Sequence, residues 1–381
     1  MEGRGEEEIL RVSPAVLLRL VAVALLLTSC ITSTDLGATP SPAKTPDIRR
    51  TRLDIAYSAF VDLDVHRPTS RAALQGAIDA LRREAKATNG KDDFPVLDLQ
   101  DSTDPQLEDF KKFADAVSAF ALRNPQLSPD RIADTAIGGM IAVAPDCHTS
   151  YISRTGQVIR SRQEASSGGG AQVPSGGVNV FGPDSNGMQA KILSGGIAYL
   201  TFRQWSITGT YNVVNALRAA LDAAVAAGAK AWLFDLRGNP GGNGADAASS
   251  FFLNGEPTLK TLVKTGNAGT ASANTDLRLP AAYQLPMVIV LNARSASATE
   301  VFALSLRENK RATLVGATTI GCLGAESPTA FSDGGELDVT VQEYIGAQSG
   351  AAYNNKGIPP DVASDDASAV EKAIAILQST R

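Results

Sequence analysis

The chain has 381 residues, of which 44% are hydrophobic and 20% are charged, and its formal net charge is −5. This composition is typical of a soluble protein with one large domain or two to three smaller ones. The mild excess of acidic residues gives no reason to expect a nucleic acid as a partner. Only two histidines are present, and no Cys/His cluster has the spacing of zinc ligands, so we expect no metal site and no cofactor.

The first thirty residues have the pattern of a lipoprotein signal peptide. An apolar run from Ala15 to Leu27 is too short to span a bilayer comfortably. It ends in Leu27-Thr28-Ser29-Cys30, which resembles the lipobox of bacterial lipoproteins. The acidic residues before the run fit a signal peptide badly and favour a true start further downstream. The alternative is a plain signal peptide with a chance cysteine. We expect Cys30 to carry lipid, palmitate included, and to anchor the chain to a membrane of the bacterial cell envelope, on the extracytoplasmic side.

The next two segments differ sharply in composition. Residues 31–49 are rich in Ser, Thr and Pro, which is typical of an extended tether. Over residues 50–145 apolar side chains recur every three or four positions, which predicts helices. Thr69-Ser70 and Thr103-Asp104-Pro105 are candidate helix caps, and Pro129-Asp130 opens a last helix. We therefore predict a small N-terminal helical domain.

From residue 146 to the C-terminus, buried strands alternate with helices. A strand, a helix and a second strand at this spacing predict a right-handed βαβ unit, and the repetition of the pattern predicts an α/β core over residues 146–381. The predicted strands are 197–202, 231–236, 287–291, 312–315 and 337–344, and the predicted helices are 211–227, a helix from 301 and 367–377.

One stretch combines three features that suit catalysis. Pro286–Leu291 is a short apolar run rich in β-branched residues, small polar residues follow it, and helical spacing resumes at Val301. A hydroxyl in this turn would lie at a helix N-terminus, where free N–H groups favour a developing negative charge. The residues alone leave two interpretations open: a nucleophilic serine, or an ordinary N-cap.

A second turn follows the predicted strand at 231–236. Its sequence, Asp235-Leu236-Arg237-Gly238-Asn239-Pro240-Gly241-Gly242, ends in a glycine pair that lets backbone N–H groups face a ligand. It matches neither the dinucleotide-binding nor the P-loop pattern. The turn is therefore either an oxyanion hole or a tight bend.

Taken together, the motifs resemble the C-terminal processing (tail-specific) peptidase family of serine proteases. They are Asp146-Cys147-His148-Thr149-Ser150-Tyr151, the turn at 235–242, Ser295-Ala296-Ser297-Ala298-Thr299-Glu300 and Lys356-Gly357-Ile358-Pro359-Pro360-Asp361. The resemblance implies a ClpP/crotonase-like spiral core and a serine endopeptidase acting on polypeptide substrates. It also implies Ser297 as the nucleophile, with an oxyanion hole formed by the N–H of Ala298 and that of Gly241 or Gly242.

The chain departs from the family pattern at two places. About forty Gly-rich residues stand where many members have a PDZ domain, so we expect that domain to be absent. Typical members have a lysine base twenty-five residues after the serine, and here that position is Cys322. In the tricorn-like branch of this fold the segment around His148 supplies the catalytic histidine, which implies that His148 replaces the lysine.

The resemblance also bears on the group that orients the base. Glu326 lies four residues after the missing lysine, where the family often has a glutamine that touches the lysine, and is the first candidate; Glu300 is the alternative. In the tricorn-like branch a glutamate before the final Gly-x-x-Pro-Asp would do this work, but here that position is Asn354. His66 lies in no motif.

Two further expectations follow. If His148 reaches Ser297, Cys147 and Cys322 should be close enough for a disulfide, the alternative being two free buried thiols. The missing lysine leaves two other functions open: a pseudoprotease that binds peptides without cleaving them, and a binder of small apolar ligands on the same fold. The oligomeric state is not predictable from the sequence.

Overall fold

The structure, a computed structural model, describes residues 46–162 and 169–380, which belong to one compact unit. The predicted signal peptide, Cys30 and most of the predicted tether lie outside the described residues. No helix in the described part of the chain is long and apolar enough to cross a membrane.

The N-terminal region is helical, as predicted. Its elements are α1 (Arg50–Leu63), α2 (Ser70–Ala87), α3 (Leu107–Arg123) and α4 (Pro129–Ile141). The Thr69 hydroxyl caps α2 by accepting the N–H of Ala72 at 3.2 Å. The predicted cap of α3 is wrong: the helix begins after Gln106, and the Asp104 N–H donates to the Ser102 hydroxyl, so these residues form a turn before the helix.

The C-terminal region contains a mainly parallel sheet. Among the described residues its strand order is β15-β12-β11-β8-β5-β4-β3. The five strands from β15 to β5 are parallel, and β4 and β3 are antiparallel additions at one edge. The strands are β3 (Val178–Phe181), β4 (Gln189–Leu193), β5 (Ile197–Thr201), β8 (Ala231–Asp235), β11 (Met287–Leu291), β12 (Thr313–Gly316) and β15 (Val362–Ala363). The sheet confirms the predicted α/β class.

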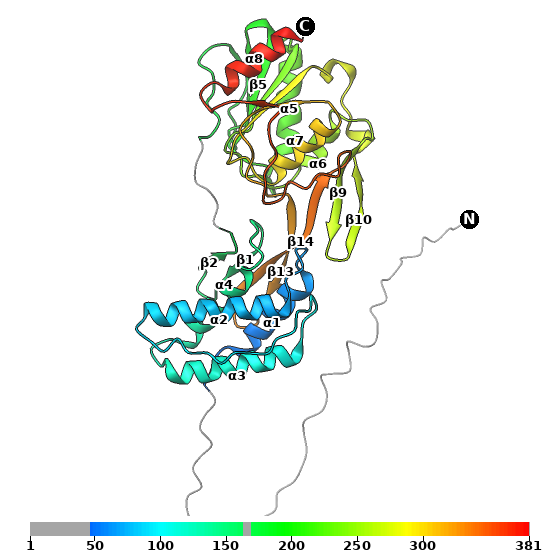
Figure 1. The fold of residues 1–381 in the computed structure, drawn as a ribbon. Coiled ribbons are helices and arrows are strands. Elements are labelled where there is room, and N and C mark those ends of the chain that lie inside the picture. Colours follow the sequence, from blue (N-terminus) through cyan, green and yellow to red (C-terminus); the bar gives the residue numbers. More distant parts are fainter. Residues whose placement is uncertain (1–45, 163–168, 381) are drawn as a thin grey trace, which may run out of the picture. The chain divides into compact units, whose positions relative to one another are not determined.

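Helices cover both faces of this sheet (Figure 1). Along β11, Met287, Ile289 and Leu291 pack with helices α5 to α7, whereas Val288 and Val290 pack against α8. Because successive residues of a strand face opposite sides, a strand covered on both faces must be apolar throughout, which explains the unbroken run in the sequence. The helices are α5 (Val213–Ala226), α6 (Ala245–Ser250), α7 (Ala298–Glu308) and α8 (Ala369–Ser379).

Two helix starts differ from the sequence prediction. Helix α5 begins two residues late because the Asn212 side chain accepts the N–H groups of Val214 and Asn215 and caps it. Helix α7 begins at Ala298, three residues early, because its first turn is polar and lacks the apolar spacing on which the prediction relied.

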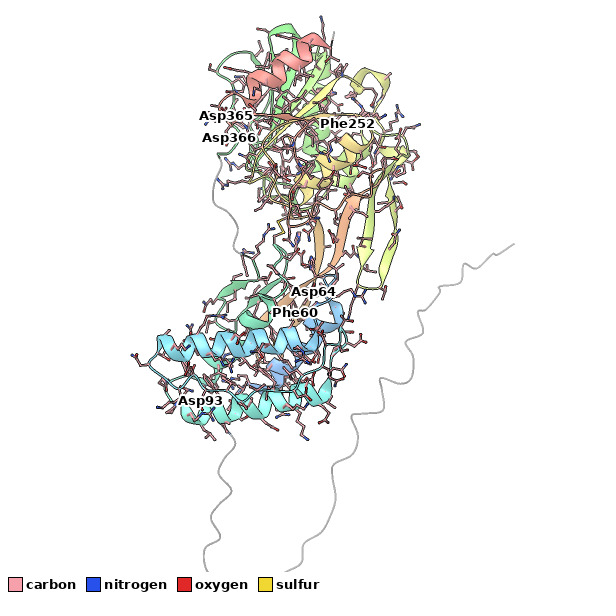
Figure 2. The ribbon with its side chains drawn as sticks, viewed as in Figure 1. Phe60, Asp64, Asp93, Phe252, Asp365 and Asp366 are labelled. Carbon is pink, nitrogen blue, oxygen red and sulfur yellow. A yellow bond between two sulfur atoms is a disulfide. The ribbon has the colours of Figure 1, made fainter. Side chains whose placement is uncertain are left out.

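A second sheet has the strand order β10-β9-β14-β1-β2, with β13 paired to β14. Its long strand β14 contributes to two hydrophobic clusters. In the first cluster Leu337 and Val339 pack with the helices α1 to α4, and in the second Tyr344 packs against the core of the parallel sheet. Figure 2 labels Phe60 in the first cluster and Phe252 in the second. The strands are β1 (Ser150–Ile152), β2 (Val158–Arg160), β9 (Pro257–Val263), β10 (Gly266–Ser272), β13 (Gly324–Ala330) and β14 (Glu336–Gly346), and a separate hairpin is formed by β6 (Ile207–Thr208) and β7 (Tyr211–Asn212).

The helical cluster includes side chains from both sides of the boundary that we predicted between residues 145 and 146. Tyr151 of β1 and Leu337 of β14 are fully buried in it. The division of the chain into a helical domain and a peptidase core stays a prediction. What the packing adds is that β14 and β1 belong to the same hydrophobic core as the four helices.

Candidate active site

Ser297 occupies a strained turn between β11 and α7. Its backbone has φ 51° and ψ −118°, a conformation that side-chain-bearing residues rarely adopt. The Ser297 N–H donates to the Glu300 carboxylate at 2.9 Å, which holds the turn at the start of the helix. A sharp strand-to-helix turn of this kind presents a serine hydroxyl outward, as in the nucleophile elbow of hydrolases.

The two serines of the motif have different surroundings. Ser295 is fully buried, and its hydroxyl accepts the Asn292 N–H at 3.0 Å and donates to the Leu236 carbonyl at 3.0 Å. The Ser297 hydroxyl faces His148, with 3.5 Å between Oγ and the imidazole Nε2. This distance is longer than a strong hydrogen bond, but proton-transfer pairs are often loose until substrate binds. Ser295 therefore stabilises the turn, and Ser297 is available for chemistry.

Asp146 lies on the other side of the imidazole. Its Oδ1 is 3.6 Å from His148 Nδ1, and it accepts the backbone N–H of His148 at 2.7 Å. The carboxylate is fully buried and also accepts the Thr340 hydroxyl at 2.6 Å and the Asn354 amide at 2.7 Å. Burial opposes its ionisation, but these hydrogen bonds hold the pKa of Asp146 well below its usual range.

The carboxylate changes the basicity of His148. Burial alone would lower the pKa of the imidazole, but the hydrogen bond and charge of Asp146, with smaller contributions from Glu326 and Glu300, raise it above 6.5. Our sequence analysis missed Asp146, although it stands two residues before His148 in the same motif. The available signal was the Asp-x-His spacing itself.

Glu326 and Glu300, the two candidates for the orienting group, lie elsewhere. Glu326 is exposed, and no hydrogen bond between it and His148 is recorded in the described part of the chain, so its effect on the imidazole is a longer-range electrostatic one. Glu300 is fully buried and turned towards the loop that follows β12, where it accepts the Thr319 hydroxyl and the N–H groups of Gly321 and Cys322. Burial raises the pKa of Glu300, and these hydrogen bonds oppose the rise.

The predicted oxyanion donors lie around Ser297. A Cβ on Gly241 would come within 2.6 Å of Ser297 Cβ and 2.8 Å of the Ala298 nitrogen, so only glycine fits there. The Gly241 N–H already donates to the Asn239 side chain at 3.1 Å. Gly242 has no recorded acceptor for its N–H among the described residues, and Ala298 contributes the first N–H of α7. Gly242 and Ala298 are thus the donors left available.

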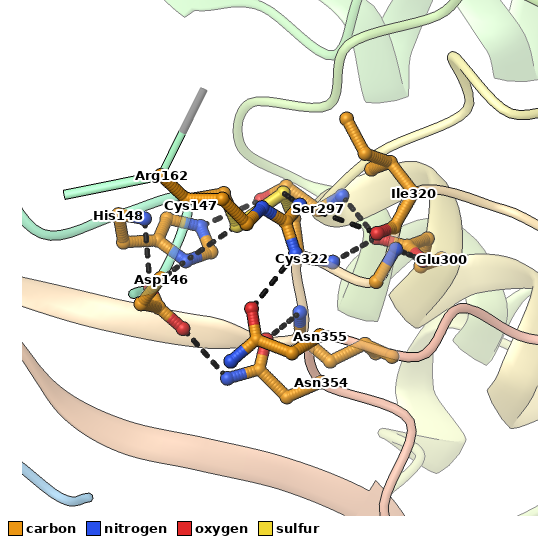
Figure 3. The surroundings of a disulfide bond; sticks show 12 residues. Asp146, Cys147, His148, Arg162, Ser297, Glu300, Ile320, Cys322, Asn354 and Asn355 are labelled. Atoms are coloured by element: carbon orange, nitrogen blue, oxygen red, sulfur yellow. Dashed lines mark hydrogen bonds and ion pairs between the residues drawn. A yellow bond between two sulfur atoms is a disulfide. The ribbon is translucent and has the colours of Figure 1, made fainter. Parts of the chain in front are cut away.

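Cys147 and Cys322 are joined by a disulfide, with 5.8 Å between their Cα atoms (Figure 3). The bond links the segment that carries His148 to the loop that Glu300 holds. Asp146, Cys147 and His148 bring three potential metal-ligand atoms within 4.8 Å of one another. A disulfide sulfur is not a thiolate and cannot act as a ligand in that form, and both oxygens of Asp146 already accept hydrogen bonds from the protein, so the group does not fit a metal ion.

Two clefts adjoin Ser297 and His148. One, of about 260 Å³, is lined by the disulfide, Pro240, Arg294 and Ile320. The other, of about 700 Å³, contains Gly242, Leu259, Val301, Glu326 and Tyr344 in its lining. The paired side chains therefore lie between two open spaces, an arrangement that can take an extended chain on both sides of a scissile bond.

Residues 196–364 match the sequence family described as Peptidase family S41. Over these residues the chain is similar to this peptidase family. The S41 region contains Ser297 and the glycine pair, whereas Asp146 and His148 precede it. The matched segment thus contains the candidate nucleophile and the candidate oxyanion donors, and the structure brings His148 to them from outside that segment.

Two relatives are similar to part of this chain. The carboxy-terminal processing protease CtpA of Bacillus subtilis (strain 168) is 31% identical over 152 residues, which are 39% of this chain and 32% of that protein. The carboxyl-terminal-processing protease of Synechocystis sp. (strain ATCC 27184 / PCC 6803 / Kazusa) is 33% identical over 168 residues, 43% of this chain and 37% of that protein. The chain thus spans about a third of the length of these relatives.

Among solved structures, the photosystem II D1 C-terminal processing protease is 24% identical and covers 46% of this chain, which covers 45% of that chain. The TM-score of this superposition is 0.40, a value too low to support an inference about the fold.

Proposed function

We propose that the protein is a serine endopeptidase in which Ser297 is the nucleophile, His148 the general base and Asp146 the group that orients the base. The observation that carries the proposal is the array Asp146–His148–Ser297, in which a buried carboxylate faces Nδ1 and the serine hydroxyl faces Nε2 of one imidazole. This is the arrangement by which serine hydrolases activate a hydroxyl, whatever their fold.

The steps of the reaction follow from the geometry. His148 takes the Ser297 proton while Oγ attacks the substrate carbonyl, and the negative charge that develops on the carbonyl oxygen is stabilised by the N–H groups of Ala298 and Gly242. The imidazolium, held by Asp146, then gives its proton to the leaving amine. Water hydrolyses the acyl-enzyme by the same route, with His148 again as base.

Polypeptides are the substrates that this site suits. The clefts on both sides of Ser297 support binding of an extended chain, and the relatives named above are proteases that process carboxyl termini. The larger cleft has a mixed lining, with Glu326 and Gln342 beside Leu259 and Val301, so it can contact both the polar backbone and the side chains of a peptide. A pseudoprotease remains the main alternative, because the lysine base is replaced by Cys322.

We further propose that the protein is anchored by lipid on Cys30 in the bacterial cell envelope. The lipobox-like sequence supports the anchor, and the Cys147–Cys322 disulfide supports an oxidising compartment outside the cytoplasm. Metabolic labelling with a palmitate analogue tests the anchor: the label should be lost in Cys30→Ala and kept in Cys322→Ala. Label that persists in Cys30→Ala would contradict it.

A fluorophosphonate probe tests the peptidase proposal, because only an activated serine reacts with it. We expect the full chain to be labelled and Ser297→Ala to be unlabelled. Ser295→Ala is the matched control and should retain labelling. A folded protein that does not react would favour the pseudoprotease, and labelling that depends on Ser295 would show that the wrong serine was chosen.

A further inference from the structure

We propose that His66 is a positioning residue that shares the buried Asp146 carboxylate with His148 and lets His148 act as a base at a lower pH than it would without His66. The inference rests on the proposed function, since it concerns the group that orients the base. No motif points to His66, which lies eighty residues before Asp146 in the sequence.

The two imidazoles flank one carboxylate. His66 Nε2 lies 3.7 Å from Asp146 Oδ2, and His148 Nδ1 lies 3.6 Å from Asp146 Oδ1. The chain has only these two histidines, and both approach the same fully buried side chain. The amide nitrogen of Asn354 contacts both His66 and Asp146. It donates to Asp146 at 2.7 Å and lies 3.4 Å from His66 Nε2.

The other side of the His66 ring is held by Asp64, at the end of α1 (Figure 2). Oδ1 of Asp64 is 2.8 Å from His66 Nδ1 and accepts the backbone N–H of His66 at 2.8 Å. Asp64 is fully buried, and its Oδ2 has no hydrogen-bond partner among the described residues. A buried carboxylate of this kind is stabilised by a nearby positive charge, which His66 supplies when its ring is protonated.

The segment that carries His66 and the side chain of Asp146 are both held by strand β14. The Val65 N–H donates to the Thr340 carbonyl at 2.9 Å, and the Thr340 hydroxyl donates to Asp146 at 2.6 Å. Both contacts come from one residue of β14. The ring of His66 therefore has little freedom to move away from Asp146, although 23% of its side chain remains exposed and can exchange protons with solvent.

Several charged groups surround each imidazole, and they differ between the two. His66 faces Asp64, Asp146 and Glu343, and Lys356 lies near Glu343. His148 lies beside Asp146, and the charges of Glu326 and Glu300 act on it at longer range.

Asp146 is the carboxylate that both imidazoles share, so protonation of one ring makes protonation of the other less favourable. The hydrogen bond to Asp64 raises the pKa of His66 above 6.5, so a charged His66 offsets part of the effect of Asp146 on His148.

Titration of the two ring systems by NMR in the full chain tests the inference without requiring hydrolysis. In the unmodified protein we expect the His148 ring signal to titrate in two steps, the second reporting His66. In His66→Gln the His148 midpoint should rise by about half a pH unit or more, the scale of coupling between charges across one carboxylate. The acid limb of the kcat/KM profile should move in the same direction.

Glu343→Gln is the matched control, because it removes a charge beside His66 that does not face His148. It should lower the His66 midpoint and move that of His148 much less than His66→Gln does. The proposal would be overturned if His148 titrates in a single step whose midpoint is the same in His66→Gln. It would also be overturned if His66→Gln and Glu343→Gln shift the His148 midpoint equally. If His66→Gln does not fold, the two-step curve of the unmodified chain still decides. Failure of fluorophosphonate labelling would instead reject the proposed function and leave the ring titration interpretable.

Discussion

The two halves of the candidate site are held in place by different means. The nucleophile half is a backbone construction: a strained residue between β11 and α7, a glycine pressed against it, and the Glu300 carboxylate on the N–H groups of the surrounding loops. The base half consists of side chains on an irregular segment before β1, held by β14, by Asn354 and by a disulfide. The comparison teaches that the first half rests on backbone geometry at the ends of two neighbouring strands, β8 and β11, whereas the second half depends on side chains from distant parts of the chain.

The largest expected effect comes from the nucleophile half. Ser297→Ala should reduce peptide hydrolysis by roughly 10⁴- to 10⁶-fold, because nothing replaces the attacking oxygen. Its free energy of unfolding should change by less than about 1 kcal/mol, since the turn is held through the backbone. Ser295→Ala should instead lower stability by about 1–3 kcal/mol, because it leaves buried backbone groups unpaired. Chemical denaturation with parallel peptide assays measures both, and the reverse pattern would exchange the roles of the two serines.

The next effect concerns Asp146. Asp146→Asn removes the charge beside His148 and places an amide against that of Asn354, so we expect kcat/KM to fall by roughly 10³- to 10⁴-fold. Glu326→Gln is the control, because Glu326 is an exposed carboxylate in the same electrostatic neighbourhood, and it should change kcat/KM by less than about tenfold. If Glu326→Gln has the larger effect, our original assignment of Glu326 is right and that of Asp146 is wrong.

Removal of the disulfide should have a smaller effect on activity and a clear one on stability. The bond joins cysteines 175 residues apart, for which the chain-entropy model gives about 5 kcal/mol. The double variant Cys147→Ser, Cys322→Ser should therefore unfold at a lower denaturant concentration and lose several-fold in kcat/KM, because His148 is next to the tether. Added reductant should destabilise the unmodified protein and leave the double variant unchanged. Equal sensitivity of the two proteins would show that the bond does not form.

The smallest expected effect is on the pH dependence. His148 must be neutral to accept the Ser297 proton, so kcat/KM should be low in acid and rise as the imidazole loses its proton. Because Asp146 raises the pKa of His148, we expect the midpoint of the rise above 6.5, which is higher than for a free imidazole. A pH–rate profile under kcat/KM conditions measures it. An identical rise in His148→Ala would assign the midpoint to another group.

The sequence by itself determined the class of fold, and through the family resemblance it singled out Ser297 as the candidate nucleophile. An unbroken apolar run predicts a strand covered on both faces, and small polar residues before a helical pattern predict a tight turn; these are local properties that neighbouring residues decide. The Ser297 motif and the glycine turn could therefore be recognised before the structure was known. Local patterns decided element boundaries less well, as the wrong cap of α3 shows, because several nearby polar residues compete for that role.

Only the tertiary structure decided which groups surround the base. Asp146, Asn354 and His66 come from three segments, and β14 brings the first and the last together through Thr340. No spacing in the sequence encodes the contacts of Asn354 and His66, because they depend on how β14 pairs with β1 and how the segment after α1 packs on it. The resemblance placed a glutamate where Asn354 stands, and in the folded chain that asparagine instead holds the carboxylate of Asp146. A buried charge is stabilised by whichever partners the fold brings to it, and sequence distance does not limit that choice.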